Sequence, residues 1–429
     1  MLYWFLMEHF STIVFYMFSF LSVYVQVFFL MTFLEKRKSI IIRKGPIELK
    51  EYPGVTIIVP CYNEEGTIER TVRSLLSLDY PKDKLNLILI DDGSQDNTWE
   101  VIQSFKSKIT GQRNVRTFRK ENGGKYTALN LGLEHTETPF LGCLDADSFV
   151  DGQALKRIMS YFLADPATMA VAPSIVVHEP KNIIQSAQKA EYDMAIYTKK
   201  MLGFMGGIHV TPGPFSIFRK KVFEDLGHYR QAHNTEDQEI ALRMQSRGYK
   251  IDHCPDAYVY TISPNTIVKL YRQRLRWIYG FIKNAMDYRF LLFKKKYGNI
   301  AFFTLPSGFI SVASIIFLMF FVGHRVVAFA SDKILELNTV GLGSMSNFQF
   351  DWFFLNIQAI SFVSVVLYGL VISALLLGRR MSGSRKPLSL DILYFVVIYT
   401  FLAPFWMMKA IFNAIRSKES SWTAERAVR

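Results

Sequence analysis

Cysteine is scarce in this sequence, and the few cysteines form no recognisable framework. The 429 residues include only Cys61, Cys143 and Cys254, which are far apart and contain no Cys-x-x-Cys pair. An odd and widely spaced set of this kind argues against a disulfide scaffold. Each cysteine lies in an apolar run, and we interpret all three as reduced core residues.

Acidic residues are also in deficit, because 37 Asp and Glu stand against 50 Lys and Arg and give a formal net charge of +13. The basic residues gather at the borders of apolar segments and form no single stripe, which disfavours a nucleic-acid binder and favours an anionic lipid surface. Hydrophobic residues make up 50% of the chain, but 20% of it is charged, which is too much for membrane spans alone. We expect one soluble domain together with a set of membrane helices.

Four apolar segments are long enough to cross a bilayer, which takes about 20 residues. They are residues 11–34, 305–322, 352–377 and 392–412. No basic region precedes the first segment and no small-residue cleavage site follows it, so it does not look like a cleavable signal. Lys and Arg are absent before it and frequent at 36–44, which predicts an outside N-terminus and a cytoplasmic stretch from 53 to 298.

The side of the membrane on which the C-terminus lies stays open. Four complete spans place it outside, whereas Lys409, Arg416 and Lys418 favour the cytoplasm. Pro404 lies inside the fourth segment and leaves a broken or re-entrant helix as an alternative.

Between the first two apolar segments, strand-like and helix-like patterns alternate. The strand-like runs are residues 55–60, 85–90, 115–118 and 140–144, and each precedes a stretch with helical spacing of its apolar residues. This alternation predicts an α/β fold with a mostly parallel sheet covered on both faces. Such sheets bind ligands at the carboxyl ends of their strands, where the polar clusters of this sequence lie.

Three of these polar clusters have two interpretations each. They contain Pro60, Tyr62 and Glu64, then Asp91 and Asp92, then a glycine pair ahead of Lys125. Carboxylates at strand ends can bind a ribose or a uracil, and a lysine at the start of a helix can bind a diphosphate. Ordinary turns have the same composition, so these clusters alone do not distinguish a binding site from surface loops.

Asp145 and Asp147 form the sharpest cluster, because they directly follow the apolar run 140–144. Alternation along an extended chain puts both carboxylates on one side, where they can share a divalent ion with substrate phosphates. The alternative is that both acids cap the following helix. Further on, Glu236 and Asp237 begin an amphipathic stretch, where a carboxylate can act as a base or as a helix cap.

A basic and aromatic cluster precedes the second apolar segment. It holds Gln273, Arg274, Arg276 and Trp277 on a helix-like stretch beside the membrane. On local grounds these residues fit either a ligand site or ordinary interfacial anchors.

In this order the clusters resemble those of the family 2 inverting glycosyltransferases, specifically the processive membrane synthases of poly-N-acetylglucosamine, chitin, hyaluronan and cellulose. The likeness covers residues 55–277 by motif and the membrane segments by layout. It implies a GT-A type nucleotide-sugar-binding domain with a mostly parallel sheet, about four transmembrane helices and interfacial helices. The stretch 274–280 is most similar to poly-N-acetylglucosamine synthases, whereas the lack of an appended C-terminal regulatory domain argues against a cellulose synthase.

The resemblance implies a donor site. It assigns Pro60, Tyr62, Glu64, Asp91 and Asp92 to the nucleotide, Lys125 to the donor diphosphate, and Asp145 and Asp147 to a DxD pair that holds Mg or Mn. We therefore expect a divalent cation as the cofactor.

The resemblance also implies the catalytic and acceptor residues. Thr235, Glu236 and Asp237 match a TED motif in which Asp237 is the general base. Gln273, Arg274, Arg276 and Trp277 match a QxxRW motif, associated with the donor diphosphate and with the acceptor end of a growing chain. Residues 213–215 and Arg219 resemble the segment on the acceptor side that precedes TED.

The implied function is transfer of a sugar from a nucleotide-sugar donor, UDP-GlcNAc or another UDP-sugar, with inversion to a growing β-linked polysaccharide that is exported. The implied partners are that donor, the polysaccharide acceptor and the lipid bilayer, with a small membrane subunit left open and no nucleic acid. The alternative is transfer of a single sugar to a lipid. A nonenzymatic membrane transporter or scaffold whose soluble domain only binds nucleotide sugars is disfavoured, because binding needs no base.

The expected order of domains follows from these assignments. A membrane helix with a basic flank (1–44) precedes a cytoplasmic GT-A glycosyltransferase domain (53–262), interfacial helices with the QxxRW motif (263–300), and C-terminal transmembrane segments with a tail (301–429). Trp422 and Arg426 resemble an element of some polymer synthases that would place the tail in the cytoplasm. The expected location is the cell membrane, as a multi-pass protein.

Overall fold

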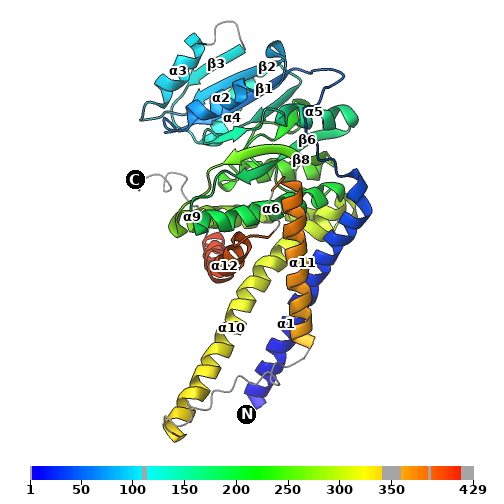
Figure 1. The fold of residues 1–429 in the computed structure, drawn as a ribbon, viewed down its shortest axis with the longest axis vertical. Helices are drawn as coiled ribbons and strands as arrows, with labels where there is room; N and C mark the ends of the chain where they lie inside the picture. The colour runs from blue at the N-terminus through cyan, green and yellow to red at the C-terminus, as the bar shows by residue number, and fades with distance from the viewer. Residues whose placement is uncertain (1, 109–113, 341–358, 385–387, 417–429) are drawn as a thin grey trace.

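The structure is a computed structural model that describes residues 2–108, 114–340, 359–384 and 388–416. It has three levels, which Figure 1 shows from top to bottom. An α/β domain lies above a layer of helices, and long helices extend from that layer away from the domain.

The domain is built on one eight-stranded sheet with the order β3-β2-β1-β4-β7-β6-β8-β5. The strands are β1 (Val55–Cys61), β2 (Leu85–Asp91), β3 (Asn114–Arg119), β4 (Phe140–Cys143), β5 (Ser148–Val150), β6 (Thr168–Val177), β7 (Ile217–Arg219) and β8 (Lys250–Thr261). Four of the seven neighbouring pairs are parallel, and the pairs β4–β7, β6–β7 and β5–β8 are antiparallel. The predicted α/β fold with a mostly parallel sheet is therefore confirmed.

Helices cover both faces of this sheet. One core cluster contains side chains of α2 (Ile68–Leu76), α3 (Thr98–Lys108) and α5 (Ala154–Ala164). The other contains side chains of α4 (Lys125–Glu134), α7 (Lys221–Leu226) and α8 (Glu236–Ser246). A strand covered on both sides needs apolar residues at nearly every position, and Val55, Ile57 and Ile58 in β1 are all fully buried.

Two long helices, α6 (Ile183–Phe204) and α9 (Ile267–Asp287), lie beneath the sheet (Figure 1). Each begins at a side chain that accepts a backbone N–H of the first turn: Asn182 caps α6 and Thr266 caps α9. The two helices separate the α/β domain from the apolar helices. The predicted QxxRW residues lie on α9, which places them at this border.

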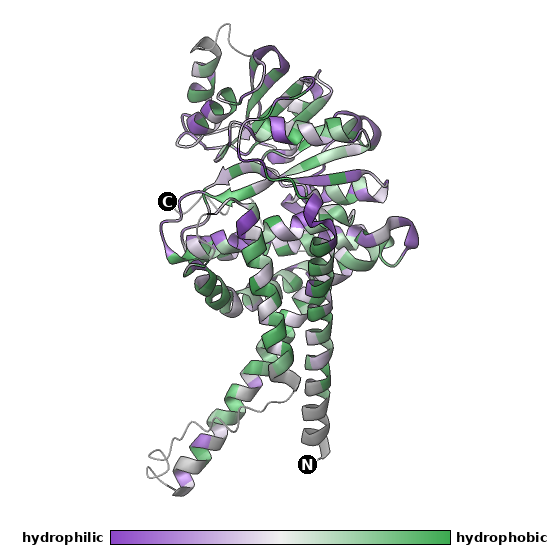
Figure 2. Ribbon diagram, turned by 45° about the vertical axis from the view of Figure 1, so that its right-hand side comes forward, coloured by the Kyte–Doolittle hydropathy of each residue, from purple (hydrophilic) through white to green (hydrophobic). Residues whose placement is uncertain are grey.

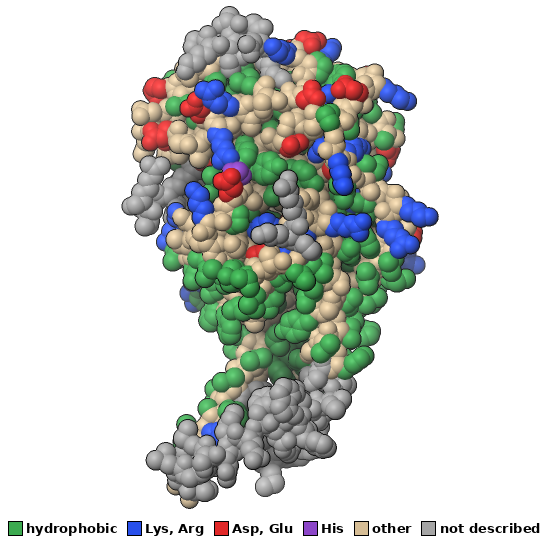
Figure 3. Space-filling model, viewed as in Figure 1, with side chains coloured by type: hydrophobic (Ala, Val, Ile, Leu, Met, Phe, Trp, Pro, Cys, Tyr) green, Lys and Arg blue, Asp and Glu red, His purple; other side chains and the backbone are tan. Residues whose placement is uncertain are grey.

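In the described part of the chain, four helices are long and apolar enough to cross a membrane, as the sequence predicts. They are α1 (Leu2–Lys36), α10 (Leu305–Val340), α11 (Ala359–Met381) and α12 (Asp391–Ile415). Figure 2 shows hydrophobic residues along most of the length of these helices, and Figure 3 shows apolar side chains gathered below a domain whose surface carries charges. The third predicted segment begins at 352, and its residues 352–358 lie outside the described part of the chain. Trp422 and Arg426 lie outside it as well.

The fourth apolar helix, α12, is continuous and contains Pro404. The broken-helix alternative therefore does not hold for its described residues. Unlike α1, α10 and α11, it is seen nearly end-on in Figure 1, and it packs against α6 and α9. It is thus placed directly beneath the helix that carries the QxxRW residues.

The contact between α11 and α6 leaves no room for a side chain at Gly378. A Cβ atom added there would lie 1.9 Å from the carbonyl oxygen of Asp193. The neighbouring Arg379 is buried and pairs with Asp193 at 3.4 Å and with Asp391. Small residues that allow this close approach commonly decide how helices associate in membranes.

We expect Gly378→Ala to destabilise the protein by about 1–3 kcal/mol, since the added methyl group forces the two backbones apart. The measurement is the thermal unfolding midpoint in detergent, which should fall by roughly 5 °C. Gly369→Ala is the matched control, because Gly369 lies on the same helix with no atom within 4 Å of an added Cβ. Equal midpoints for the two variants would contradict the close α11–α6 contact.

Candidate active site

A cavity of about 650 Å³ lies between the α/β domain, α9 and the apolar helices. Most of the residues predicted from the sequence line it: Pro60, Tyr62, Glu64, Asp92, Lys125, Asp145, Asp147, Glu236, Asp237, Gln273, Arg276 and Trp277. Asp91 and Arg274, which the sequence also predicts, do not line it. The cavity thus joins side chains from strand ends with side chains from the helical layer.

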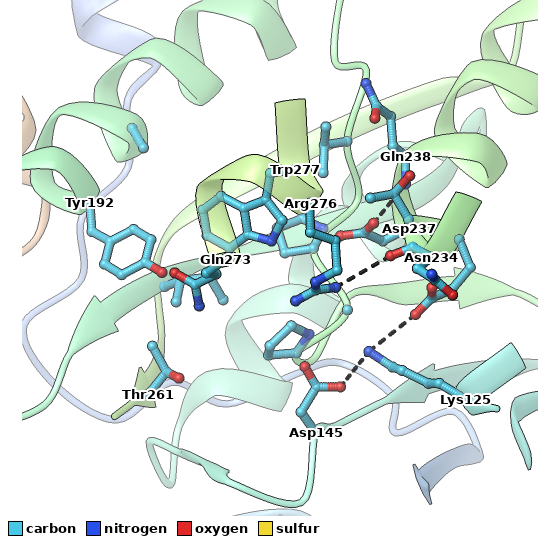
Figure 4. Close-up of a pocket in the computed structure, with 18 of the residues that line it drawn as sticks. Lys125, Asp145, Tyr192, Asn234, Asp237, Gln238, Thr261, Gln273, Arg276 and Trp277 are labelled. Atoms are coloured by element: carbon cyan, nitrogen blue, oxygen red, sulfur yellow. Dashed lines mark hydrogen bonds and ion pairs between the residues drawn. The ribbon is translucent and has the colours of Figure 1, made fainter. Parts of the chain in front are cut away.

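Lys125 connects two of the acidic clusters. Its Nζ lies 2.6 Å from Asp145 Oδ1 and 3.2 Å from Glu236 Oε1, and Figure 4 shows the ion pair between Lys125 and Asp145. Gly213 lies against the same lysine, because an added Cβ would come within 2.8 Å of its Nζ. A side chain at 213 would therefore displace Lys125 from Asp145.

Asp91 and Asp92 behave differently although they are neighbours. Asp92 accepts hydrogen bonds from the backbone N–H groups of Gly123 and Gly124 at 3.2 and 2.9 Å, so these amides already have an acceptor. It also pairs with Lys120. Asp91 is fully buried and pairs with Arg119 at 2.9 Å. Asp92 faces the cavity and orders the glycine turn, whereas Asp91 is held behind it.

Three carboxylates come together at one end of the cavity. Burial, together with the negative charges of Asp145 and Glu64, raises the pKa of Asp147 to about 6. Crowded carboxylates of this kind suit a hard divalent cation, which accepts oxygen ligands and removes the repulsion. In the described part of the chain no three His, Cys, Asp or Glu side chains are placed to hold a metal by themselves.

Asp237 lies at the start of α8 and faces the cavity. Burial and the nearby carboxylate of Glu236 raise its pKa to about 6, against the opposing effect of Lys125 and Arg276. Its Oδ1 accepts the backbone N–H of Gln238 at 2.9 Å. At neutral pH the group is ionised and still basic enough to accept a proton, as a general base must be.

The loop in front of Asp237 is held by α9. Residues 232–234 all have positive φ, between 48° and 61°, which costs free energy for side chains other than glycine. Arg276 donates to the carbonyl of Asn234 at 3.3 Å, and Asn284 donates to Thr235 Oγ1 at 2.8 Å. The helix that carries the QxxRW residues thus also supports the loop that presents the acid.

The two arginines of the stretch 273–277 face different ways. Arg276 lines the cavity beside Trp277, whereas Arg274 is buried behind the wall and pairs with Glu191 at 2.5 Å. Figure 4 shows Gln273, Arg276 and Trp277 on one side of the cavity, across from Asp145 and Lys125. The position of Arg274 does not support the predicted contact with a diphosphate.

Residues 56–227 match the protein-family model described as glycosyl transferase family 2. These residues form the sheet from β1 to β7 and contain both cavity aspartates of the DxD pair. Residues 56–227 are a glycosyltransferase family 2 domain.

Curated relatives extend the likeness. The poly-beta-1,6-N-acetyl-D-glucosamine synthase of Staphylococcus aureus (strain MSSA476) is 34% identical over 241 residues, which are 56% of this chain and 57% of that protein. The synthase of the same description from Staphylococcus epidermidis is 32% identical over 235 residues, 54% and 56% of the two chains. The chain thus spans a little over half the length of the curated relatives that it matches.

A solved structure confirms the fold of the family 2 domain and its surroundings. A mannosyltransferase from Pyrobaculum calidifontis, solved with GDP-Man and Mn²⁺, superposes with a TM-score of 0.57 at 16% sequence identity. The match covers 94% of this chain and all of the mannosyltransferase chain.

The cavity beside the family 2 domain also has lining residues that the sequence did not predict. Lys199 of α6 is among them, and burial lowers its pKa to about 8. His209 is another, with a pKa lowered to about 4 by burial. The apolar helices contribute Ser311 and Met407. No motif marks these positions, because only the fold brings α6, α10 and α12 together at the cavity.

Proposed function

We propose that this chain is a membrane glycosyltransferase that uses a UDP-sugar, with UDP-GlcNAc as the first candidate, to extend a β-linked polysaccharide with inversion. The cavity is the single observation that carries the proposal. One continuous wall combines the acids of the family 2 domain with residues of the apolar helices such as Ser311 and Met407. A donor site that opens toward membrane helices suits an enzyme whose product enters the membrane. The relatives described as poly-beta-1,6-N-acetyl-D-glucosamine synthases support this choice of sugar.

We propose a role for each of the main residues that line the cavity. Asp237 accepts the proton of the acceptor hydroxyl as that oxygen attacks the anomeric carbon from the face opposite the nucleotide. Arg276 and Lys125 offset the charge that develops on the departing diphosphate. Trp277 and Gln273 hold the acceptor sugar. One displacement without a covalent intermediate inverts the anomeric configuration.

Asp145 and Asp147 are proposed to hold Mg²⁺ or Mn²⁺ together with oxygens of the donor diphosphate. When bound, the cation would supply positive charge beside the leaving group. The Mn²⁺ in the solved mannosyltransferase is compatible with this proposal.

We also propose that the enzyme lies in the cell membrane with its family 2 domain on the cytoplasmic side, where nucleotide sugars are made available. The basic flank of α1, which includes Lys36 and Arg37, supports this orientation.

The experiment is an assay of the purified protein in nanodiscs with UDP-GlcNAc, UDP-glucose, UDP-glucuronate and GDP-mannose. Nucleotide release and product size are measured with Mg²⁺, Mn²⁺ or EDTA. We expect a UDP-sugar to yield a product ladder, and EDTA to reduce turnover by about a hundredfold. A single sugar attached to a lipid would support the alternative function, and full activity in EDTA would refute the metal assignment.

A further inference from the structure

Arg274 joins three helices at the border of the membrane. It belongs to α9 and is only 4% exposed. One guanidinium nitrogen lies 2.5 Å from Glu191 Oε2 on α6 and 3.3 Å from the hydroxyl of Tyr399 on α12. The Tyr399 hydroxyl also donates to Glu191, which closes a triangle of contacts.

The same guanidinium supports the aromatic wall of the cavity. It lies 4.1 Å from the ring centroid of Trp277 and 5.8 Å from that of Tyr192. Its other terminal nitrogen donates to Gln273 Oε1 at 3.0 Å. Trp277, Tyr192 and Gln273 all line the cavity, and Figure 4 shows the three on the same side of it. Arg274 therefore touches the cavity only through other side chains.

We propose that Arg274 is a positioning residue. Through the Glu191–Arg274–Tyr399 network it holds Trp277 and Gln273 at the acceptor end of the cavity, and it links their position to that of helix α12. This inference rests on the proposed function, because it assigns a role in holding the polymer. A planar guanidinium is suited to the task, since it stacks on a ring and bonds in its own plane at the same time.

Helix α12 contributes to the cavity at a second point, which strengthens the connection. Met407 lies eight residues beyond Tyr399 on α12, about 12 Å along the helix, and lines the cavity itself. Between them, Trp406 is buried and packs edge-on against Tyr399, with ring centroids 5.6 Å apart. A shift of α12 would thus move Met407 directly and Trp277 through Arg274.

The network also bears on the base. α9 supports the loop of Asp237 through Arg276 and Asn284, so a fixed α9 fixes both the acceptor wall and the proton acceptor. Loosening of the network should impair retention of the polymer first, because Trp277 is in direct contact with Arg274.

The test compares Tyr399→Phe with Tyr394→Phe, the same change on the same helix outside the network. We expect Tyr399→Phe to shorten the product about threefold while the KM for the UDP-sugar stays within about twofold, with no change for Tyr394→Phe. Arg274→Lys keeps the charge but loses the planar fork, and should shorten the product more. Glu191→Gln combined with Tyr399→Phe should cost little more than the worse single change, because both act through one network.

Hydrogen–deuterium exchange gives a readout that does not depend on activity. Tyr399→Phe should raise the exchange of peptides from 267–287 and 232–237, whereas Tyr394→Phe should not. Unchanged exchange and product length would overturn the proposal. A raised donor KM with unchanged product length would place Arg274 at the diphosphate instead. A fall in thermal stability and product length together with a rise in the donor KM would mean that the network has a structural role only. If the parent used no donor, the proposed function would fail, and exchange alone would decide whether the network positions α9.

Discussion

Asp237→Asn is expected to reduce sugar transfer by about a thousandfold while donor binding changes by less than about threefold, because general-base catalysis contributes in this range. The substitution removes the proton acceptor and leaves the shape of the side chain intact. The hydrogen bond from Gln238 N to Oδ1 at 2.9 Å can be kept by the amide oxygen, so the start of α8 should not unfold. The measurement is nucleotide release together with titration of the UDP-sugar.

The pH profile gives a second measure of the same carboxylate. Since burial and Glu236 raise the pKa of Asp237 to about 6, the base is ionised above that pH and protonated below it. Transfer by the parent should therefore fall about tenfold per pH unit below 6. Asp225→Asn, a change of the same chemistry on α7 at a residue that does not line the cavity, serves as the control and should leave the profile unaltered. Activity of Asp237→Asn within tenfold of the parent would remove Asp237 from this role.

The α/β part of the fold could be predicted because its signals are local. The parallel strands β1 and β2 are apolar runs, such as residues 85–90, and each is followed by a helix with regular apolar spacing. The strands β6 and β8, which also pair in parallel, had no predicted counterpart. Helix α6 had no predicted counterpart either. It buries Gln188, Asp193 and Lys200, which are accommodated only because partners distant in the chain, such as Pro264 and Asp252, bond to them. A sequence pattern cannot reveal partners of this kind.

The sequence predicted which residues belong to the site more completely than it predicted which way they face. Arg274 and Arg276 are two positions apart on a helix, which separates their directions by about 200°. Helical spacing alone thus indicates that only one of them can face the cavity. Whether Arg274 or Arg276 faces the cavity depends on how α9 packs against α6 and α12, and the motif does not predict that packing.

Loss of the indole in Trp277→Ala should reduce polymer synthesis by about thirtyfold and leave nucleotide binding nearly unchanged. Stacking a sugar ring on the indole covers roughly 80 Å² of apolar surface, which at about 25 cal/mol/Å² stabilises the bound acceptor by about 2 kcal/mol. Trp277 is well placed for this contact, because it lines the cavity from α9 and its other face is held by Arg274 at 4.1 Å.

The product ladder on a gel is the deciding measurement for this prediction, with nucleotide titration beside it. Trp277→Phe keeps a smaller ring and should recover part of the long product, while Val268→Ala, an exposed position on the same helix, should behave as the parent does. Trp277→Ala should also release its polymer early, because weaker binding of the acceptor end raises the dissociation rate more than it changes the association rate. Equal ladders from Trp277→Ala and the parent would exclude the indole from acceptor binding. A parent that produced only a monosaccharide–lipid would refute the processive mechanism itself, whatever the variants did.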